Sequence, residues 1–140
     1  MGVKMSGRLV GATGIELKHE DSGSIIRTSP PADNGGDGSS FSPTDLAAAS
    51  LGSCAATTLA LFAQRNGIPL TGVTFDVEKL MHVSPRRLGR VVLRMRIDSP
   101  CSDEDFAKLV EAAKGCPVKR SLAPEVELDE TYARASLNVR

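Results

Sequence analysis

The stretch SPTDLAAASLGSCAATTLALFAQRNGI, residues 42–68, decides the fold of this 140-residue chain, because it has the signals of one long helix. Ser42 fits the N-cap, and Pro43 fits the first helical position, where its missing N–H is not needed. Asp45 follows Ser42 by three residues, so the two side chains predict a capping box. Gly67 suits the residue that ends a helix. We therefore expect a central helix over residues 42–67.

The apolar side chains of this helix do not form a single stripe. Small residues occupy most of the positions between them, and Gly52 costs about 1 kcal/mol relative to alanine in a helix interior unless close packing offsets it. A helix that is apolar on every side is buried on every side. The pattern favours a homodimer, in which a sheet covers one side of the helix and a second subunit the other. The alternative is a monomer whose sheet and second helix wrap around it.

The rest of the chain completes an α+β order of elements. Residues 1–41 predict short strands followed by a Gly- and Pro-rich loop, and residues 71–98 alternate in the manner of an antiparallel β-hairpin. Residues 102–122 predict two helices, with Ser102 as the cap of the first, and residues 125–140 predict a C-terminal strand. We expect one domain over residues 1–140.

Composition excludes several classes of protein. The chain has 17 basic and 17 acidic residues and is 41% hydrophobic, so it lacks the basic excess of a nucleic-acid-binding protein and has enough apolar side chains for a core. Its basic cluster, RRLGRVVLRMR, fits one face of a strand better than a phosphate patch. No signal peptide or membrane span is expected from the sequence. We therefore expect a cytoplasmic protein with no nucleic-acid or membrane partner.

Three cysteines in such a chain do not suggest a disulfide framework. Cys54 lies inside the long helix, where spacing alone leaves both packing and chemistry open. Cys116 precedes a helix-starting proline, and a thiol at such an N-cap is activated by the free N–H groups, so local chemistry ranks it as the more activated thiol. Cys101 is expected to be a bystander. His19 and His82 are isolated and have no metal-ligand spacing, so no metal site is expected.

Two motifs together are more specific than either alone. The stretch SPTDLAAASLGSCAATTLALFAQRNGIPLTGV, followed by GCPVKRSL, resembles the OsmC/Ohr family of bacterial thiol-dependent peroxidases over residues 42–122, and its PTDL and LGSC segments are closer to the OsmC-like branch. The resemblance implies an intertwined homodimer whose antiparallel sheets wrap around two central helices. It also implies an enzyme that reduces organic or inorganic hydroperoxides and defends the cell against oxidative or osmotic stress.

The resemblance further assigns roles to two thiols. It implies that Cys54 attacks the peroxide and becomes a sulfenic acid, and that Cys116 then forms a disulfide with Cys54. No metal or organic cofactor is implied, and an external dithiol reduces the disulfide.

The helix motif departs from the family pattern at one position. Typical members have Pro-Glu, and that glutamate holds an arginine beside the thiolate, whereas Thr44 follows the proline here and Asp45 comes one residue later. Arg8 and Arg27 are the candidate arginines. Two other hypotheses therefore stay open: a non-enzymatic protein on the same fold that binds a small ligand or responds to redox state, and a thiol-based hydrolase or transferase, which would need a base.

Overall fold

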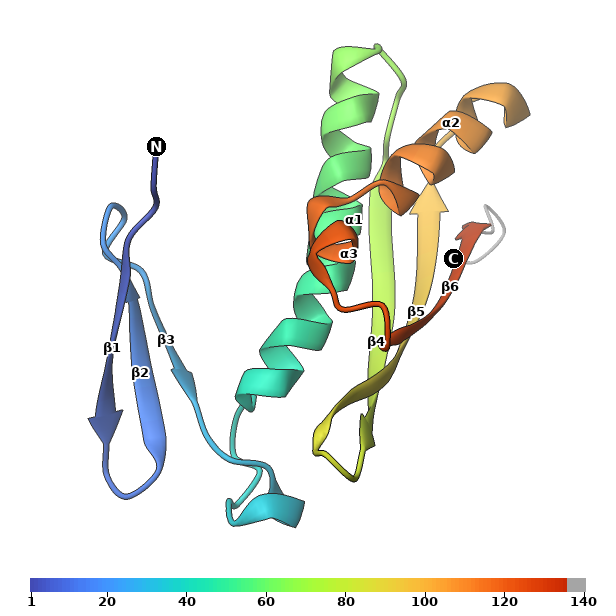
Figure 1. The fold of residues 1–140 in the computed structure, drawn as a ribbon. Coiled ribbons are helices and arrows are strands. Elements are labelled where there is room, and N and C mark those ends of the chain that lie inside the picture. The colour runs from blue at the N-terminus through green and yellow to red at the C-terminus, as the bar shows by residue number, and fades with distance from the viewer. Residues whose placement is uncertain (136–140) are drawn as a thin grey trace. The chain divides into compact units, whose positions relative to one another are not determined.

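The computed structural model describes residues 1–135, which divide into two compact units (Figure 1). The first unit comprises Met1–Ala47 and the second begins at Ala48. The last residues of the predicted C-terminal strand, 136–140, lie outside the described part of the chain.

The first unit is an antiparallel three-stranded sheet followed by a loop. Its strands are β1 (Met5–Val10), β2 (Gly14–His19) and β3 (Ile25–Thr28), with β2 in the middle. The Gly- and Pro-rich loop that follows contains one short 3-10 helix, η1 (Ala32–Asn34). Short strands followed by a loop are the order that the sequence predicts for residues 1–41.

The long helix α1 (Pro43–Arg65) has the predicted caps at both ends. The Ser42 backbone N–H donates to Asp45 Oδ2 at 2.8 Å, and the Asp45 N–H donates to Ser42 Oγ at 3.1 Å, so the capping box is confirmed. Gly67 has a φ of 63°, the left-handed conformation that ends many helices and that glycine adopts without steric cost.

The second unit contains a second three-stranded sheet, in the order β4, β5, β6. Strands β4 (Gly72–His82) and β5 (Arg87–Asp98) form the antiparallel pair that the sequence predicts. Strand β6 (Glu127–Arg134) runs parallel to β5, which corrects the expectation of purely antiparallel sheets. The reason is the connection: α2 (Asp103–Lys114) and α3 (Pro117–Ser121) lie between the two strands and return the chain to the end where β5 began.

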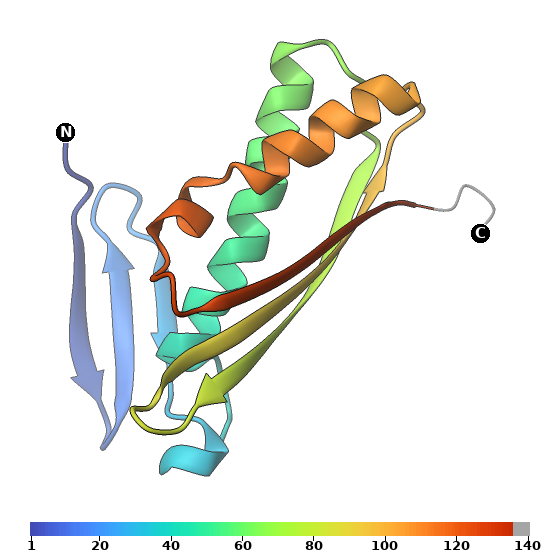
Figure 2. The same ribbon diagram turned by 45° about the vertical axis from the view of Figure 1, so that its right-hand side comes forward.

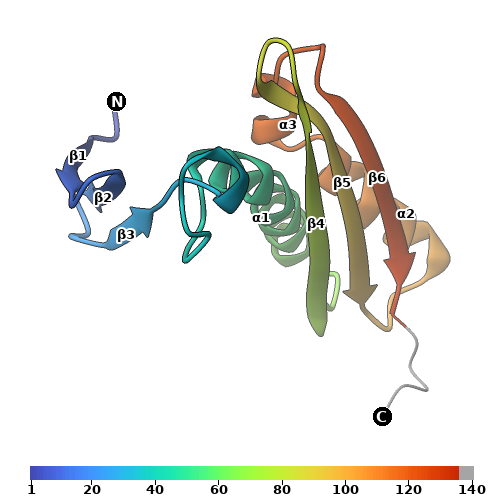
Figure 3. The ribbon, with the colours of Figure 1, turned by 90° about the horizontal axis from the view of Figure 1, so that it is seen from below.

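The core of the second unit lies between the helices and one face of this sheet (Figures 2 and 3). Alternate residues of β5 point into it, and they pack with side chains from α1, α2 and the start of α3. The fully or almost fully buried members of this core include Leu51, Leu59, Val91, Leu93, Met95, Ile97, Leu109, Ala113 and Cys116. Because all three helices contribute to one core, residues far apart in sequence meet on the same side of the sheet.

The other face of the sheet carries ion pairs. Arg94 pairs with Asp129 of β6 at 3.0 Å, Arg90 pairs with the same carboxylate, and Arg96 pairs with Asp76 of β4 at 2.9 Å. The basic cluster of the sequence therefore lies partly along a strand face whose arginines are matched by carboxylates on both neighbouring strands.

Helix α1 is buried on one side and open on the other within a single chain. Leu51, Ala55 and Leu59 are fully buried, whereas Leu61 is 42% exposed. By length and hydropathy α1 could cross a membrane, contrary to the expectation from the sequence, but a core helix of a globular protein meets the same criterion. Within one chain α1 is therefore covered on one side, and the expectation that a second subunit covers the other side stays a prediction.

Gly52 is required where α1 approaches β4. A Cβ atom at this position would lie 2.4 Å from the ring of Phe75 and 3.0 Å from Val77 Cγ2. The small residues of this helix predict that another element packs closely against it. In the structure, the sheet is the surface that Gly52 approaches.

We predict that Gly52→Ala destabilises the protein. The forced displacement of Phe75 costs up to about 3 kcal/mol, more than the ~1 kcal/mol that alanine gains in helix propensity. Thermal unfolding followed by circular dichroism checks this, with Arg65→Ala, at an exposed position at the end of the same helix, as the control. An unchanged or raised melting temperature for Gly52→Ala would show that α1 does not pack on β4 at this distance.

Candidate functional site

The structure brings two cysteines together from separate helices. Cys54 projects from the middle of α1 and is half-buried, whereas Cys116 is the N-cap of α3 and is fully buried. The Cys54 side chain lies near enough to Cys116 to raise the pKa of the Cys116 thiol, and both side chains belong to the same core cluster. The Cys54 carbonyl oxygen accepts a hydrogen bond of 2.8 Å from Thr58 Oγ1, one turn further along α1. Two neighbouring thiols, one of them partly accessible, make this part of the core the candidate site for cysteine chemistry.

The environment of Cys116 corrects the ranking that its local sequence suggests. Cys116 does occupy the N-cap position before Pro117, as predicted. Burial nevertheless raises its pKa, the Lys119 backbone amide acts in the opposite direction, and the nearby Cys54 and Glu130 raise the pKa further. These causes favour the neutral form of the Cys116 thiol and act against the activation that the N-cap pattern alone predicts.

A polar cluster lies beside the two thiols. Lys119 Nζ of α3 is 2.6 Å from Glu130 Oε2 of β6, and the Tyr132 hydroxyl donates to Glu130 Oε1 at 2.8 Å. The Glu130 side chain is only 9% exposed. Burial and the Glu130 carboxylate raise the pKa of Tyr132 well above its usual value, so its hydroxyl stays protonated as the donor. Each carboxylate oxygen thus has one donor, and the cluster places an acidic group in the field of Cys116.

Sequence reasoning missed this cluster. Glu130 and Tyr132 belong to the stretch ELDETYAR, whose alternation indicates a strand, and nothing in it marks the glutamate as a core-facing residue. The available signal is the two-residue spacing of Leu128, Glu130 and Tyr132, which puts a carboxylate between an aliphatic and an aromatic residue on one face.

Thr44 and Asp45 lie in the first turn of α1, in the first unit. Asp45 closes the capping box with Ser42, and the Thr44 hydroxyl is 3.2 Å from the Ser42 hydroxyl. These contacts give Asp45 a clear role in starting the helix.

The candidate arginines are held by a single carboxylate of the first sheet. Arg8 Nε is 3.0 Å from Glu16 Oε1, and Arg27 is 3.1 Å from Glu16 Oε2. The hydrogen bond from Arg8 is the largest cause that lowers the pKa of Glu16, and Arg27 contributes in the same direction. Glu16 is a residue that sequence reasoning did not single out. It fixes both arginines across neighbouring strands while their side chains remain largely exposed.

The remaining cysteine and the two histidines have structural contacts of their own. The Cys101 backbone N–H donates to Ser99 Oγ at 3.2 Å, and its side chain packs at the edge of the core. His82 Nδ1 is 3.1 Å from the Pro85 carbonyl oxygen. His19 Nδ1 lies 2.8 Å from Ser22 Oγ in the turn between β2 and β3. Within residues 1–135, no group of three potential ligands is arranged to hold a metal ion.

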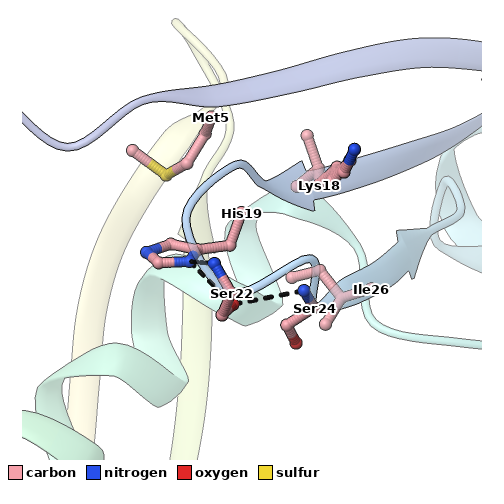
Figure 4. A pocket seen from close by; sticks show the side chains of 7 residues that line it. Met5, Lys18, His19, Ser22, Ser24 and Ile26 are labelled. Carbon is pink, nitrogen blue, oxygen red and sulfur yellow. Dashed lines mark hydrogen bonds between the residues drawn. The ribbon is translucent and has the colours of Figure 1, made fainter.

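The first unit carries a shallow apolar hollow of about 490 Å³ (Figure 4). Met5, Leu17 and Ile26 supply most of its lining, and the turn with His19 and Ser22 closes one side, where hydrogen bonds join these two residues and Ser24. Met5 and Ile26, which line the hollow, are among the exposed apolar side chains of this sheet.

Comparisons with known proteins agree with this structure. A family model described as OsmC-like protein matches residues 36–131. A solved protein from Psychrobacter arcticus, described by its title as an osmotic stress induced and detoxification response protein, is 31% identical, with a TM-score of 0.86 over 94% of this chain and 97% of the other. No match was found among curated proteins.

More distant structures share the fold. An OsmC-like protein from Mycoplasma pneumoniae is 16% identical, with a TM-score of 0.78 over 97% of this chain and 99% of the other. An organic hydroperoxide resistance protein from Legionella pneumophila is 19% identical, with a TM-score of 0.75 over 96% and 98% of the two chains. These matches confirm the α+β class and the OsmC-like fold. On its family match and its 31% identical relative, the chain belongs to the OsmC-like protein family.

Proposed function

We propose that this protein is a thiol-dependent peroxidase that reduces hydroperoxides through Cys54 and Cys116. The observation that carries the proposal is that the fold places Cys54 and Cys116 near each other in one core cluster, although they come from different helices and lie far apart in sequence. Family membership supports a redox role, and the Legionella protein of the same fold is an organic hydroperoxide resistance protein by its title.

The first chemical step uses the more accessible thiol. The Cys54 thiolate attacks the distal oxygen of the hydroperoxide, the O–O bond breaks, and the leaving alkoxide takes up a proton to become an alcohol. The sulfur supplies both electrons and becomes a sulfenic acid. Cys54 is half-buried, which lets a small or lipophilic peroxide reach it, whereas Cys116 is fully buried.

The second step protects Cys54 from further oxidation. The Cys116 sulfur attacks the Cys54 sulfur, the S–O bond breaks, and the hydroxide leaves as water with the proton of Cys116. An external dithiol then reduces the disulfide by thiol exchange and restores both thiols. No metal or organic cofactor takes part, and the protein acts in the cytoplasm in defence against oxidative or osmotic stress.

The arginine pair on Glu16 concerns the motif position at which this chain departs from the family. Thr44 stands where typical members of the family have the motif glutamate. Here the carboxylate that binds Arg8 and Arg27 is that of Glu16.

We predict that Cys54→Ser abolishes peroxide consumption with dithiothreitol and cumene hydroperoxide as substrates. Cys116→Ser retains the first turnover but accumulates a dimedone-reactive sulfenic acid at Cys54, which proceeds to sulfinic acid because no partner thiol intercepts it. Cys101→Ser is the matched control and keeps the wild-type rate. Full turnover by Cys54→Ser would refute the proposal, and a ligand bound without any peroxide consumption by the wild type would favour the non-enzymatic alternative.

We also propose that the protein is a homodimer that covers the open side of α1. This side is formed by small and apolar positions that are exposed in the single chain, namely Ser53, Thr57, Ala60 and Leu61. Burial of such a face removes apolar surface from water and permits close approach of a second helix.

We predict that Leu61→Glu shifts the protein from dimer to monomer in sedimentation velocity, because a carboxylate in the interface would lose its hydration. Ala107→Glu, at an exposed position on α2 away from this face, is the control for added charge. A wild-type protein that sediments as a monomer at every concentration tested would contradict the dimer.

A further inference from the structure

A largely buried ion pair joins the short helix α3 to strand β6. Lys119 Nζ is 2.6 Å from Glu130 Oε2, and the Tyr132 hydroxyl donates to Glu130 Oε1 at 2.8 Å. The Glu130 side chain is 9% exposed and that of Lys119 is 32% exposed. Apolar residues of similar volume often stabilise a core as well as a buried ion pair does. Stability alone therefore does not explain this pair, and the two chemical steps proposed above do not use it.

Strand β6 is the fixed end of this contact. Glu130 lies opposite Leu93 of β5, a residue with no exposed surface. Leu128 and Tyr132 flank Glu130 on the same face of the strand, and both pack against the core. The backbone of β6 is thus held by the sheet, and each oxygen of the Glu130 carboxylate has a donor. The carboxylate has a defined position to which another element can be attached.

Helix α3 depends on tertiary contacts for its position. It has five residues, Pro117–Ser121, and an isolated helix of this length is not stable in water. Gly115 ends α2 just before it, so α3 is not a continuation of the longer helix. Val118 packs against the core, and Lys119 gives α3 its ion pair with the sheet. The ion pair is therefore one of the contacts that place α3 against β6.

The same turn of α3 carries Cys116. This cysteine is the N-cap of the helix, and its carbonyl oxygen accepts a hydrogen bond of 3.3 Å from the Arg120 N–H. Lys119 follows Cys116 by three residues, and residues at this spacing lie on the same side of a helical turn. One turn thus holds the Cys116 side chain in the core and the Lys119 side chain at Glu130. Any movement of α3 relative to β6 moves the Cys116 sulfur as well.

We propose that Lys119 and Glu130 are positioning residues, whose ion pair holds α3 so that the Cys116 sulfur can bond to that of Cys54. This inference rests on the proposed function, in which the two sulfurs join in a disulfide. Such a bond needs a sulfur–sulfur distance of about 2 Å and a Cα–Cα distance of roughly 4.4–6.8 Å. These limits leave little room for movement of a five-residue helix.

Two reactions compete for the oxidised Cys54 sulfur. In the productive one, the Cys116 sulfur attacks it, an S–S bond forms, the S–O bond breaks, and the hydroxide leaves as water with the proton of Cys116. In the competing one, a second hydroperoxide gives its distal oxygen to the sulfenic sulfur and leaves as an alcohol, and Cys54 becomes a sulfinic acid. Loss of the ion pair slows the first reaction and not the second, so more Cys54 ends as sulfinic acid.

The first experiment measures the position of the thiols without any peroxide. The full-length protein is equilibrated with mixtures of reduced and oxidised glutathione, and the fraction with a Cys54–Cys116 disulfide gives the effective concentration of one thiol at the other. Lys119→Met should lower this concentration on the order of three- to tenfold, because α3 loses its charged contact with β6. A loss of overall stability affects the reduced and disulfide forms alike and does not move this ratio.

Two further variants separate the ion pair from general effects of substitution. Lys119→Arg restores a cation and should keep the effective concentration near the wild-type value. Lys114→Met removes a lysine whose side chain is 47% exposed and which pairs with Glu111 on α2, and it should change nothing. If Lys119→Met does not fold, Lys119→Gln, which keeps a neutral donor, takes its place with the same expected fall. A wild-type value in the folded variant would overturn the positioning role.

The second experiment follows the fate of Cys54 during turnover. With cumene hydroperoxide and dithiothreitol, the share of Cys54 recovered as sulfinic acid per turnover should rise on the order of three- to tenfold in Lys119→Met and stay low in Lys119→Arg. An unchanged share in Lys119→Met would contradict the proposal. Failure of the proposed function has a different signature, since a wild-type protein that consumes no hydroperoxide can still show the fall in effective concentration in glutathione.

Discussion

Close packing of α1 on the sheet of the second unit is the constraint on which the site depends. Gly52 lets the helix approach Phe75 of β4, and Cys54 lies two residues further along the same helix. The buried side chains of α1, α2 and β5 share one core, which brings the start of α3 and its Cys116 to Cys54. A helix held further from the sheet would separate the two thiols, so backbone proximity at a glycine controls the chemistry available at a cysteine.

Cys54 and Cys116 lie in different environments, although both are cysteines. Cys116 is fully buried and faces the Glu130 carboxylate, and both conditions favour its neutral form. Cys54 is partly accessible and lies next to a thiol that can donate a hydrogen bond. Strand β6, which runs parallel to β5, carries Glu130 and Tyr132, and their side chains are joined by a hydrogen bond.

Much of the fold could be predicted from local signals in the sequence. Ser42, Asp45 and Gly67 mark the ends of α1, Ser102 marks the start of α2, and alternation marks the β4–β5 pair, because caps and periodicity depend on near neighbours in the chain. The parallel placement of β6 was not predicted, since the direction of a strand after a helical crossover depends on tertiary packing.

The site was predictable only in part. The family resemblance singled out Cys54 and Cys116, which the structure places in one core cluster, and their roles stay predictions. Local chemistry favoured Cys116 as the activated thiol, because the sequence shows an N-cap and does not show burial or a carboxylate from another element. Lys119, Glu130 and Tyr132 come from two elements whose contact no spacing rule encodes. Glu16 was missed for the same reason, since its two arginines lie on the strands on either side of it.

The most direct test of the central claim is the mass of reduced protein after one equivalent of an organic hydroperoxide, measured within seconds and mapped to peptides. A redox pair formed by Cys54 and Cys116 predicts the loss of two hydrogens per chain and a single disulfide that joins these residues. Slow addition of oxygen, scattered over the cysteines and reaching Cys101 first, would contradict it and would leave Cys54 as a packing residue.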